Sequence, residues 1–370
     1  MTMKEISFEI NNDLLKQLIQ KKKDLNLKNE DWDTFFTLLL GIPSKPKSSK
    51  EIIENTLQKK TFNQYYDSWI QNFTQNLKYF SNGKSVQELS PKINPELNKS
   101  SSIVIGRGPS LKKHAHLEEL AKSNFQGNIL CTDGILKNAL EAGVTPDRFP
   151  NFYVVTIDTN EEIKKFYEHK TIKKYGKKIK CLLSTTIPHS TYNAIKKSGL
   201  EIFWLHTLFD YNKGKSSFNY ISGQMTKTKN HPNGFPAIQT GGNVGTSCWI
   251  IAWSILKSNY IGLIGIDHGY SVDTPWEIIS KYHPLSENVD KNSIVFKKAY
   301  PKIYNPDYNS YSIQDPVFQY YSQALKEFIP KAPKWTKTIN ATEGGTIFGK
   351  KIECTTLNNF LKKYNFYTNS

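Results

Sequence analysis

SSIVIGRGPSLKK, residues 101–113, joins an apolar run to a glycine-rich turn and then to a basic segment. The β-branched triplet at 103–105 is typical of a short buried strand. Gly106 and Gly108 permit a tight turn that other residues resist. Ser110 stands where a helix N-cap is expected, so backbone amides at the helix start would point at a ligand above the strand. The stretch therefore predicts either an anion site or a turn that merely joins a strand to a helix.

Two common nucleotide-binding patterns do not fit this stretch. A dinucleotide fingerprint needs a third glycine at the position that Leu111 occupies. The full Walker A pattern, Gly-x-x-x-x-Gly-Lys-Ser/Thr, does not occur in the sequence either. The sequence therefore predicts neither a typical NAD enzyme nor a P-loop kinase.

The composition favours an anionic ligand. The chain has 370 residues and a formal net charge of +16, most of it from lysine. Such a charge suits anionic ligands, nucleic acid or an anionic membrane surface without choosing among them. The sequence has no RNA-binding signature, zinc-finger spacing or arginine-rich arm, so we expect no nucleic-acid partner. The cysteines predict neither a zinc site nor a disulfide framework, because they lie far apart, at Cys131, Cys181, Cys248 and Cys354.

The sequence carries no evident targeting signal. The first residues, MTMKEISFEINNDLL, lack the apolar core of a signal peptide. The longest apolar run, CWIIAWSIL at 248–256, is too short to cross a bilayer. These features predict a cytoplasmic protein without a transmembrane segment.

Three regions are expected along the chain. Residues 1–100 show helical spacing of apolar residues between lysine-rich and Ser/Pro-rich linkers, and predict an N-terminal helical region. From 101 to 270, short apolar runs alternate with amphipathic stretches that end at glycine, which predicts βαβ units. Residues 271–370 are expected to supply a lid segment and C-terminal helices. The fold class is therefore α/β, a mostly parallel Rossmann-like sheet with flanking helices and a C-terminal extension. Strands are expected at 103–105, 128–134, 152–158, 178–185 and 200–207, with the last at 260–270.

Ligands of such sheets bind beyond the carboxyl ends of the strands, so the residues there are the candidates. The predicted nucleotide- or phosphate-binding residues are Gly106, Gly108, Pro109, Ser110, Asp133, Gly134, Gly241, Gly242, Asn243 and Thr246. Asn243 is expected to bind a base or sugar edge. Close packing of helix on sheet explains the glycines at 241 and 242 equally well, and a turn or helix cap is the alternative for Asp133.

Transfer to a hydroxyl group needs a base, and histidine is well matched to neutral pH. His206 and His268 both end predicted strands. His268 is the preferred catalytic base because loop residues flank it, whereas His206 is equally well explained as a hydrogen-bonded core residue. Asp158 also follows a strand and is a third catalytic candidate, with a turn or cap as its alternative. His114 and His116 are expected on the surface of a helix.

The C-terminal third supplies further candidates. The stretch 271–316 has little periodicity and is expected to be a lid that includes Tyr282 and His283. An irregular segment packed on the sheet is the alternative. Polar residues at strand ends and in a glycine-rich turn are additional site candidates, namely Asp267, Tyr270, Asn340 and Glu343.

Four stretches carry a family resemblance: IVIGRGPSLKK, CTDGILKNALEAGVTPD, QTGGNVGTSCWIIAWSIL with the following IGLIGIDHGY, and INATEGGTIFG. Together they resemble the MptE-like family, in the right order and over about residues 50–365. This family includes archaeal 6-hydroxymethylpterin diphosphokinases and the Maf glycosyltransferases, which put nonulosonic sugars on flagellins. The Gly-x-Gly-Pro-Ser-Leu start is also similar to that of bacterial sialyltransferases that use CMP-sialic acid.

The resemblance implies a transferase with a phosphate-containing donor. The pterin enzymes carry Thr-Asp-Leu-Asp after the third strand, two carboxylates suited to magnesium, whereas this chain reads Val-Thr-Ile-Asp at 155–158 and keeps the second carboxylate only. The Gly-Gly-Asn-Val-Gly helix entry and the stretch 340–345 look like the Maf group, although the Gln-Asp of that group is Ile266-Asp267 here. The resemblance therefore favours sugar transfer.

Three functions follow from the sequence. The favoured one is a glycosyltransferase that takes a nonulosonic sugar from a CMP-sugar donor to a glycan or protein acceptor. The alternative is a diphosphokinase that transfers pyrophosphate from ATP to a pterin, in which case Mg²⁺ would be a cofactor. The third is a non-catalytic binder of anionic ligands.

Overall fold

The computed structural model describes residues 11–24, 32, 35, 49–210, 214–279 and 292–366. The chain divides into two compact units, Met1–Asn55 and Thr56–Ser370. In the smaller unit, helix α1 (Asn12–Asp24) carries Lys22, whose ammonium group lies 4.3 Å from the centroid of the Trp32 ring. Tyr282 and His283, expected in a lid, lie outside the described residues. The larger unit contains every other site candidate.

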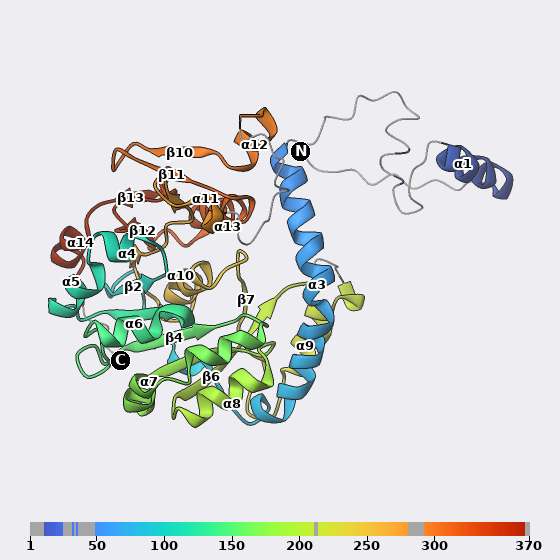
Figure 1. Ribbon diagram of the computed structural model, residues 1–370. Coiled ribbons are helices and arrows are strands. Elements are labelled where there is room, and N and C mark those ends of the chain that lie inside the picture. Colours follow the sequence, from blue (N-terminus) through green and yellow to red (C-terminus); the bar gives the residue numbers. More distant parts are fainter. Residues whose placement is uncertain are drawn as a thin grey trace. The chain divides into compact units, whose positions relative to one another are not determined.

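A mostly parallel sheet forms the centre of the larger unit (Figure 1). Its main strands are β1 (Lys84–Ser85), β2 (Ser101–Ile105), β3 (Asn128–Thr132), β4 (Phe152–Thr156), β5 (Lys180–Ser184), β6 (Glu201–Leu208), β8 (Tyr260–Ile264), β12 (Lys337–Asn340) and β13 (Ile352–Cys354). They lie in the order β1-β6-β5-β4-β3-β2-β8-β12-β13, with each neighbouring pair parallel. β7 (Ala237–Gln239) pairs with β6 off this path. The predicted α/β class and the six predicted strands are confirmed.

The strand expected to be the last, β8, is followed by two more strands of the main sheet. β12 and β13 are four and three residues long and extend the sheet beyond β8. Strands this short carry too few residues to show an alternating pattern, which is why the sequence did not predict them.

The order of the strands reverses at β2. Ile103 in β2 is opposite Ile129 of β3 on one side and Gly262 of β8 on the other. In an open parallel sheet, such a reversal leaves a crevice beyond the carboxyl ends of the strands, and ligands bind there. The turns after β2 and β8 are therefore the expected position of a site.

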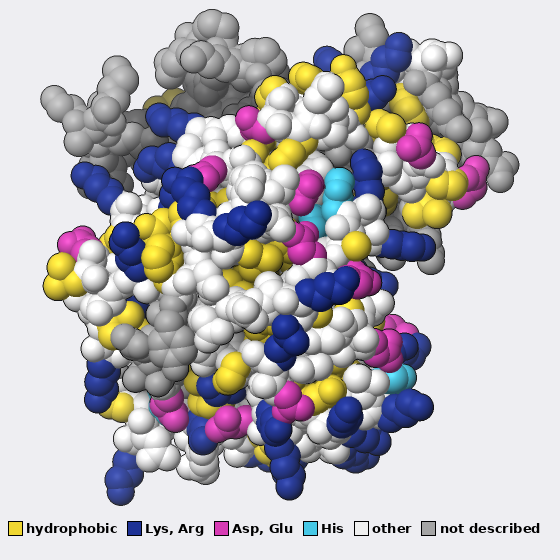
Figure 2. Space-filling model, turned by 90° about the vertical axis from the view of Figure 1, so that its left-hand side faces the viewer, with side chains coloured by type: hydrophobic (Ala, Val, Ile, Leu, Met, Phe, Trp, Pro, Cys, Tyr) yellow, Lys and Arg dark blue, Asp and Glu magenta, His cyan; other side chains and the backbone are white. Residues whose placement is uncertain are grey.

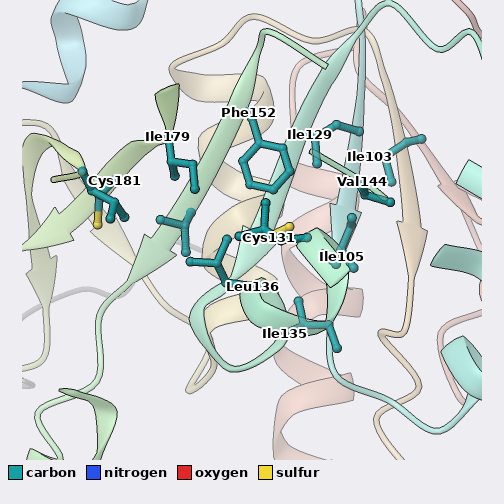
Figure 3. Close-up of a cluster of buried hydrophobic side chains, with 14 of the residues drawn as sticks. Ile103, Ile105, Ile129, Cys131, Ile135, Leu136, Val144, Phe152, Ile179 and Cys181 are labelled. Atoms are coloured by element: carbon teal, nitrogen blue, oxygen red, sulfur yellow. The ribbon is translucent and has the colours of Figure 1, made fainter. Parts of the chain in front are cut away.

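Helices cover both faces of the sheet. One face carries α5 (His116–Lys122), α6 (Leu136–Glu141), α7 (Lys170–Tyr175), α8 (His189–Lys197) and α14 (Leu357–Lys363), and the other carries α10 (Val244–Ser254) and α13 (Pro316–Phe328). Figure 3 shows the first layer, where Ile103 lies near Val144 and Ile105 lies near Ile135. Val104, between them, belongs to the layer on the other face. Because both faces are covered, the strand reads as a continuous apolar run.

Helix α3 (Ser49–Phe80) crosses the boundary between the two units. Phe73 and Phe80 near its end are fully buried in the larger unit. Nδ2 of Asn76 donates hydrogen bonds to the carbonyl groups of Thr185 at 3.1 Å and Ile187 at 2.8 Å, which follow β5. The boundary predicted between residues 100 and 101 therefore lies inside a compact unit, because side chains of α3 hold a loop of the sheet.

The segment between β8 and β12 contains a second, small sheet. Its strands are β9 (Tyr270–Ser271), β10 (Lys302–Asn305) and β11 (Ser310–Ile313), antiparallel in the order β10-β11-β9. Helices α11 (Trp276–Ile279) and α12 (Ile294–Ala299) lie in the same segment. Its described parts are thus more regular than the irregular lid that the sequence indicated.

The remaining elements are short. They are α4 (Ser110–Lys113), α9 (Phe218–Met225), and the 3₁₀ helices η1 (Val86–Leu89), η2 (Asp133–Ile135), η3 (Glu161–Phe166), η4 (Gly176–Lys178), η5 (Gly214–Ser216) and η6 (Ile329–Lys331). Within the described ranges, no helix combines the length and the apolar character needed to cross a membrane.

Candidate functional site

The turns after β2 and β8 are bonded to each other. The amides of Gly106 and Gly108 donate to the carbonyl groups of Ile264 and Gly265, both at 2.8 Å. A Cβ atom at Gly106 would lie 2.3 Å from the Gly265 carbonyl oxygen, and one at Gly108 would lie 1.7 Å from Asp267 Oδ2. Both glycines are therefore needed for the close approach of two turns. Their amides are engaged within the protein and do not point at an anion.

Ser110 is the first residue of α4 and not its cap. Pro109 holds the N-cap position and makes no side-chain cap bond. The Ser110 hydroxyl instead donates to Asp267 Oδ2 at 2.8 Å. Burial raises the pKa of Asp267 to about 7, and hydrogen bonds from Ser110 partly oppose that rise. The predicted cap role is wrong, because the serine joins the first turn to a buried carboxyl group.

Two carboxyl groups follow the neighbouring strands β3 and β4. Oδ1 of Asp133 accepts from the Gly134 amide at 2.7 Å, while Oδ2 is buried without a hydrogen-bond partner among the described residues. Burial and the charge of Asp158 raise the pKa of Asp133 to about 7. Asp158 is exposed, and its Oδ1 accepts from the Asn160 amide at 2.9 Å. Each carboxyl group thus makes a turn bond, and the Thr156 side chain, which lowers the pKa of Asp133, is the nearby group that offers this carboxyl a further hydrogen bond.

Arg107 is a site candidate that the sequence reasoning missed. Its guanidinium group lies 5.7 Å from the centroid of the Phe166 ring in η3 and interacts electrostatically with Asp133. Arg107 also lines a cavity of about 640 Å³ between α4, α5 and α6, whose wall includes Gly108, Pro109 and Gly134. Three of the predicted phosphate-binding residues therefore border an open space beside a cation. The signal in the sequence was the position of this arginine between two glycines.

His268 follows β8 and is buried where the strand order reverses. Its φ angle is +44°, a conformation that persists in a histidine only where the surroundings impose it. Its Nδ1 atom is buried and has no hydrogen-bond partner among the described residues. Burial, together with the charge of Lys326, lowers the pKa of His268 to about 3, so the ring is neutral at physiological pH. The unpartnered nitrogen can hydrogen-bond to a substrate hydroxyl and take its proton.

Two residues that the sequence reasoning missed fix the backbone at His268. Nε2 of Gln314 donates to the His268 carbonyl oxygen at 3.0 Å, and Oγ1 of Thr346 donates to the same oxygen at 3.1 Å. The imidazole lies nearly parallel to the Phe318 ring, with 6.4 Å between the centroids. These three residues come from segments far along the chain, so the local sequence around GIDHGY gives no signal for them.

Tyr321 of α13 lies between the ends of β4 and β8. Its ring centroid is 6.1 Å from that of His268. A Cβ atom at Gly242 would lie 2.6 Å from Tyr321 Cε1, and the φ of +83° at Gly242 also favours glycine. Burial raises the pKa of Tyr321, and the charge of Asp158 adds to that rise. Tyr321 therefore interacts electrostatically with Asp158 and packs beside the His268 ring.

Asn243 and Thr246 form the N-cap of α10. Oδ1 of Asn243 accepts from the Thr246 amide at 2.8 Å, and Nδ2 donates to Thr246 Oγ1 at 2.9 Å. Gly241 before them has a φ of +58°. Both ends of the Asn243 amide group are thus engaged, and the predicted contact with a base or sugar edge requires this cap to open.

His206 of β6 is a hydrogen-bonded core residue. Its Nδ1 lies 2.7 Å from Thr185 Oγ1, and its Nε2 lies 2.9 Å from Ser222 Oγ. Burial lowers the pKa of His206 to about 4. Both ring nitrogens of His206 have partners, whereas His268, the other predicted base, keeps Nδ1 without a described partner.

Asn340 and Glu343 organise the loop after β12. Nδ2 of Asn340 donates to the Ile347 carbonyl group at 2.8 Å. Oε1 of Glu343 accepts from the Leu357 amide at 3.1 Å and lies 3.3 Å from His116 Nε2. His116 is fully buried, so its predicted surface position is wrong. The carboxyl group of Glu343 reaches it from another loop and gives the buried ring a polar partner.

Some of the candidate site residues interact with one another at the ends of the strands, and others lie away from this group. Pairwise interactions form a chain that runs from Arg107 through Asp133, Asp158 and Tyr321 to His268. Tyr270 is near its rim, where the hydroxyl donates to Asp315 Oδ2 at 3.1 Å. Among the described residues, no three His, Cys, Asp or Glu side chains form a group able to hold a metal ion.

Comparisons with known proteins agree with this architecture. No curated protein matches the chain. Among solved structures, a MAf glycosyltransferase from Magnetospirillum magneticum AMB-1 is similar over 81% of this chain and 40% of its own, with 10% identity and a TM-score of 0.51. This chain thus spans less than half of that protein and shares its fold. The family model described as "6-hydroxymethylpterin diphosphokinase MptE-like" matches residues 71–273, more than half of the 370 residues. The chain belongs to the MptE-like family.

Proposed function

We propose that this protein transfers a nonulosonic sugar from a CMP-activated donor to a hydroxyl group of an acceptor. Family membership and the fold shared with a MAf glycosyltransferase support a transferase. The observation that carries the proposal is the buried Nδ1 atom of His268, which has no described partner and lies at the reversal of the strand order. A base at this position suits a reaction in which a hydroxyl group is the nucleophile.

His268 acts as the base in this proposal. The acceptor oxygen forms a bond to the anomeric carbon and gives its proton to Nδ1, while the bond between that carbon and the CMP phosphate breaks and CMP leaves with the electron pair. In the free protein, burial holds the pKa of His268 near about 3. The negative charge of a bound phosphate raises the pKa of a nearby imidazole, so donor binding makes His268 a stronger base.

Arg107 stabilises the leaving phosphate. Its guanidinium group is exposed at the cavity between α4, α5 and α6. A guanidinium group pairs well with phosphate oxygens and offsets the charge that develops on them. Because the amides of Gly106 and Gly108 are engaged elsewhere, this side chain takes over the role that the sequence assigned to the turn.

The two carboxyl groups bind hydroxyl groups of the donor. Asp133 has a buried oxygen without a described partner. Burial is the main cause of the raised pKa of Asp133, and Asp158 lies close enough for its charge to raise that pKa further. Ribose and sugar hydroxyl groups donate to such oxygens. Asp158 is also the second choice for the base, because it is exposed at the same edge of the sheet.

The same carboxyl pair favours a second candidate function, pyrophosphate transfer from ATP to a hydroxymethylpterin. Mg²⁺ is commonly bound by one or two carboxylates together with substrate phosphates and water. Asp133 and Asp158 fit that requirement, since they interact and one oxygen is open. These two carboxyl groups would hold the Mg²⁺ ion. A bound Mg²⁺ ion would neutralise part of the negative charge of the phosphates.

Calorimetry with CMP, UDP, GDP and ATP, each with and without Mg²⁺, separates these functions. We expect CMP to bind roughly tenfold more tightly than the other nucleotides, about 1.4 kcal/mol. Arg107→Gln should weaken CMP binding by a similar factor. Arg148→Gln is the matched control, because Arg148 lies away from the crevice and bonds to the Ser123 carbonyl group. Preferential binding of ATP with Mg²⁺ and a pterin would favour the diphosphokinase, and no nucleotide binding would favour a non-catalytic protein.

A further inference from the structure

The β10–β11 hairpin exposes a pair of tyrosine rings. Tyr304 and Tyr311 are directly opposite each other, with 4.9 Å between the ring centroids. They are 44% and 49% exposed. The ammonium group of Lys302 lies 4.5 Å from the centroid of the Tyr311 ring. We name these three side chains the tyrosine surface, which combines two half-exposed aromatic rings with a cation that lies over one of them.

Other residues fix the hairpin to the main sheet. Nδ2 of Asn305 donates to the Gly345 carbonyl group at 3.0 Å. The Tyr308 hydroxyl lies 2.5 Å from the Asn340 carbonyl oxygen and 2.8 Å from that of Thr355. Asn340 is the last residue of β12, and Gly345 belongs to the loop that follows it. These bonds hold the hairpin at the carboxyl edge of the sheet and leave the tyrosine surface open to solvent.

The tyrosine surface is continuous with the surroundings of His268. Ile313 is two residues after Tyr311 and lies on the same side of the small sheet. It is opposite Tyr270 of β9. The Tyr270 ring lies 5.0 Å from that of Phe318, which is nearly parallel to the His268 ring. The strand register and the two ring contacts therefore relate the tyrosine surface to His268 through Ile313, Tyr270 and Phe318.

We propose that the tyrosine surface binds a sugar ring of a saccharide acceptor, an inference that rests on the proposed function. A pyranose ring has an apolar C–H face, and the face of a tyrosine ring is apolar with negative charge at its centre, so the two stack. Hydroxyl groups at the sugar rim need polar partners. Lys302 supplies one, and Asn309, whose Oδ1 accepts from the Tyr304 hydroxyl at 2.9 Å, supplies another.

The size of the surface favours a sugar over a protein partner. A tyrosine side chain carries roughly 200 Å² of surface, so two half-exposed rings offer about 200 Å² together. A specific protein interface buries about 800 Å² on each partner. Its centre is also depleted in lysine, whereas Lys302 lies directly over one ring here. The tyrosine surface therefore has room for roughly one or two sugar rings.

Saturation-transfer NMR with lactose, N-acetyllactosamine and chitobiose tests the surface without any donor. We expect the wild-type protein to transfer saturation to the ring C–H protons of at least one of these disaccharides. Tyr304→Ala and Tyr311→Ala should each lower that signal by about fivefold or more, since each removes a stacking face. Tyr311→Phe should keep the signal, because the aromatic face remains.

Tyr220→Ala is the matched control, because Tyr220 of α9 is 46% exposed and lies outside the hairpin. It should leave the signal unchanged. Failure of the wild-type protein to bind any of the three disaccharides, as expected if the partner is a protein, overturns the proposal. An undiminished signal in the folded Tyr304→Ala/Tyr311→Ala double variant also overturns it. Calorimetry of that variant with CMP should show unchanged affinity, whereas a wild-type protein that binds no CMP contradicts the proposed function and not the sugar surface.

Discussion

His268 and His206 differ in what their ring nitrogens meet, although burial lowers the pKa of both. His206 is bonded through both nitrogens to Thr185 and Ser222. His268 keeps Nδ1 open and adopts a positive φ angle. A buried polar atom without a partner destabilises the fold, so its presence in a residue with a positive φ angle is the residue-scale observation on which the proposed role of His268 rests.

His268→Asn should abolish most of the activity without removing the donor site. Asparagine tolerates a positive φ angle better than most residues, so the backbone can be kept. We expect the rate of sugar transfer to fall by ~100-fold or more, because a proton acceptor is lost, with CMP affinity within about twofold of wild type. Steady-state kinetics and calorimetry measure the two quantities.

His206→Asn is the companion variant. It should lower the free energy of unfolding by about 1–3 kcal/mol, because hydroxyl groups of Thr185 and Ser222 lose their partner. The rate per folded molecule should be retained. The reverse pattern of kinetics and unfolding would transfer the base role to His206.

Asp133→Asn should change stability in a pH-dependent way. Burial, with the charge of Asp158, raises the pKa of Asp133 from its ordinary value of 3.8 to about 7 in the folded protein. Between these values the unfolded chain releases the proton while the folded chain holds it, so stability falls as pH rises from about 4 to 7. Asparagine does not titrate. The variant should gain on the order of 2 kcal/mol over wild type at pH 8 and little at pH 4, in urea unfolding. A pH-independent difference would show that this carboxyl group is not shifted.

The sequence predicts that His206 and His268 lie at strand ends, but it does not predict which residues they bond to. Apolar runs such as IFWL and IGLI locate strands from local pattern, so His206 and His268 were correctly expected after them. The bonds that distinguish the two come from Ser222, Gln314 and Thr346, which are distant in the chain. Arg107 is different, because its position between two glycines can be read from the sequence. Only the structure shows that the glycine amides are already hydrogen-bonded, which leaves the Arg107 side chain as the group in this turn that can bind a phosphate.

At the scale of elements, the contact between the β2 and β8 turns is the critical one. Gly108→Ala would place a Cβ atom 1.7 Å from Asp267 Oδ2 and displace the carboxyl group that Ser110 holds. We expect a loss of about 1–3 kcal/mol in the free energy of unfolding. Gly223→Ala in α9 is the matched control, because no atom lies within 4 Å of its Cβ position. It should stabilise the helix by up to about 1 kcal/mol. Equal stability of the two variants in urea would argue against the close contact of the turns.

Elements were predictable where the signal is local and long enough. β2 to β6 and β8 are apolar runs bounded by turns, and all were predicted. The small sheet and β12–β13 were not, because two to four residues per strand carry no period and their pairing is set by distant residues. The turn before α10 was ambiguous for another reason. The same residue types suit a helix cap and a ligand-binding loop, and in the structure Asn243 and Thr246, which follow Gly242, form a cap.

At the scale of the whole molecule, charge alone does not locate the site. The sequence carries a net charge of +16, and Figure 2 shows lysine and arginine side chains spread over the face in view with acidic side chains among them. The site is located instead by the reversal of strand order at β2 and by the unpartnered atoms there.

The division into two compact units predicts the result of a truncation. A chain of residues 49–370 keeps α3 whole and contains the entire larger unit. We expect it to unfold cooperatively with the same urea midpoint for the sheet as the full chain, and to bind CMP equally well. Loss of folding would show that the sheet depends on residues 1–48.

The central claim is that the crevice at the ends of β2, β3 and β8 binds the donor. A crystal structure of the protein soaked with CMP tests it most directly. The claim predicts density for the phosphate beside Arg107, density for the ribose near Asp133, and an open path from the phosphate to Nδ1 of His268. Well-defined nucleotide density elsewhere, with Arg107, Asp133 and His268 unchanged, would contradict it.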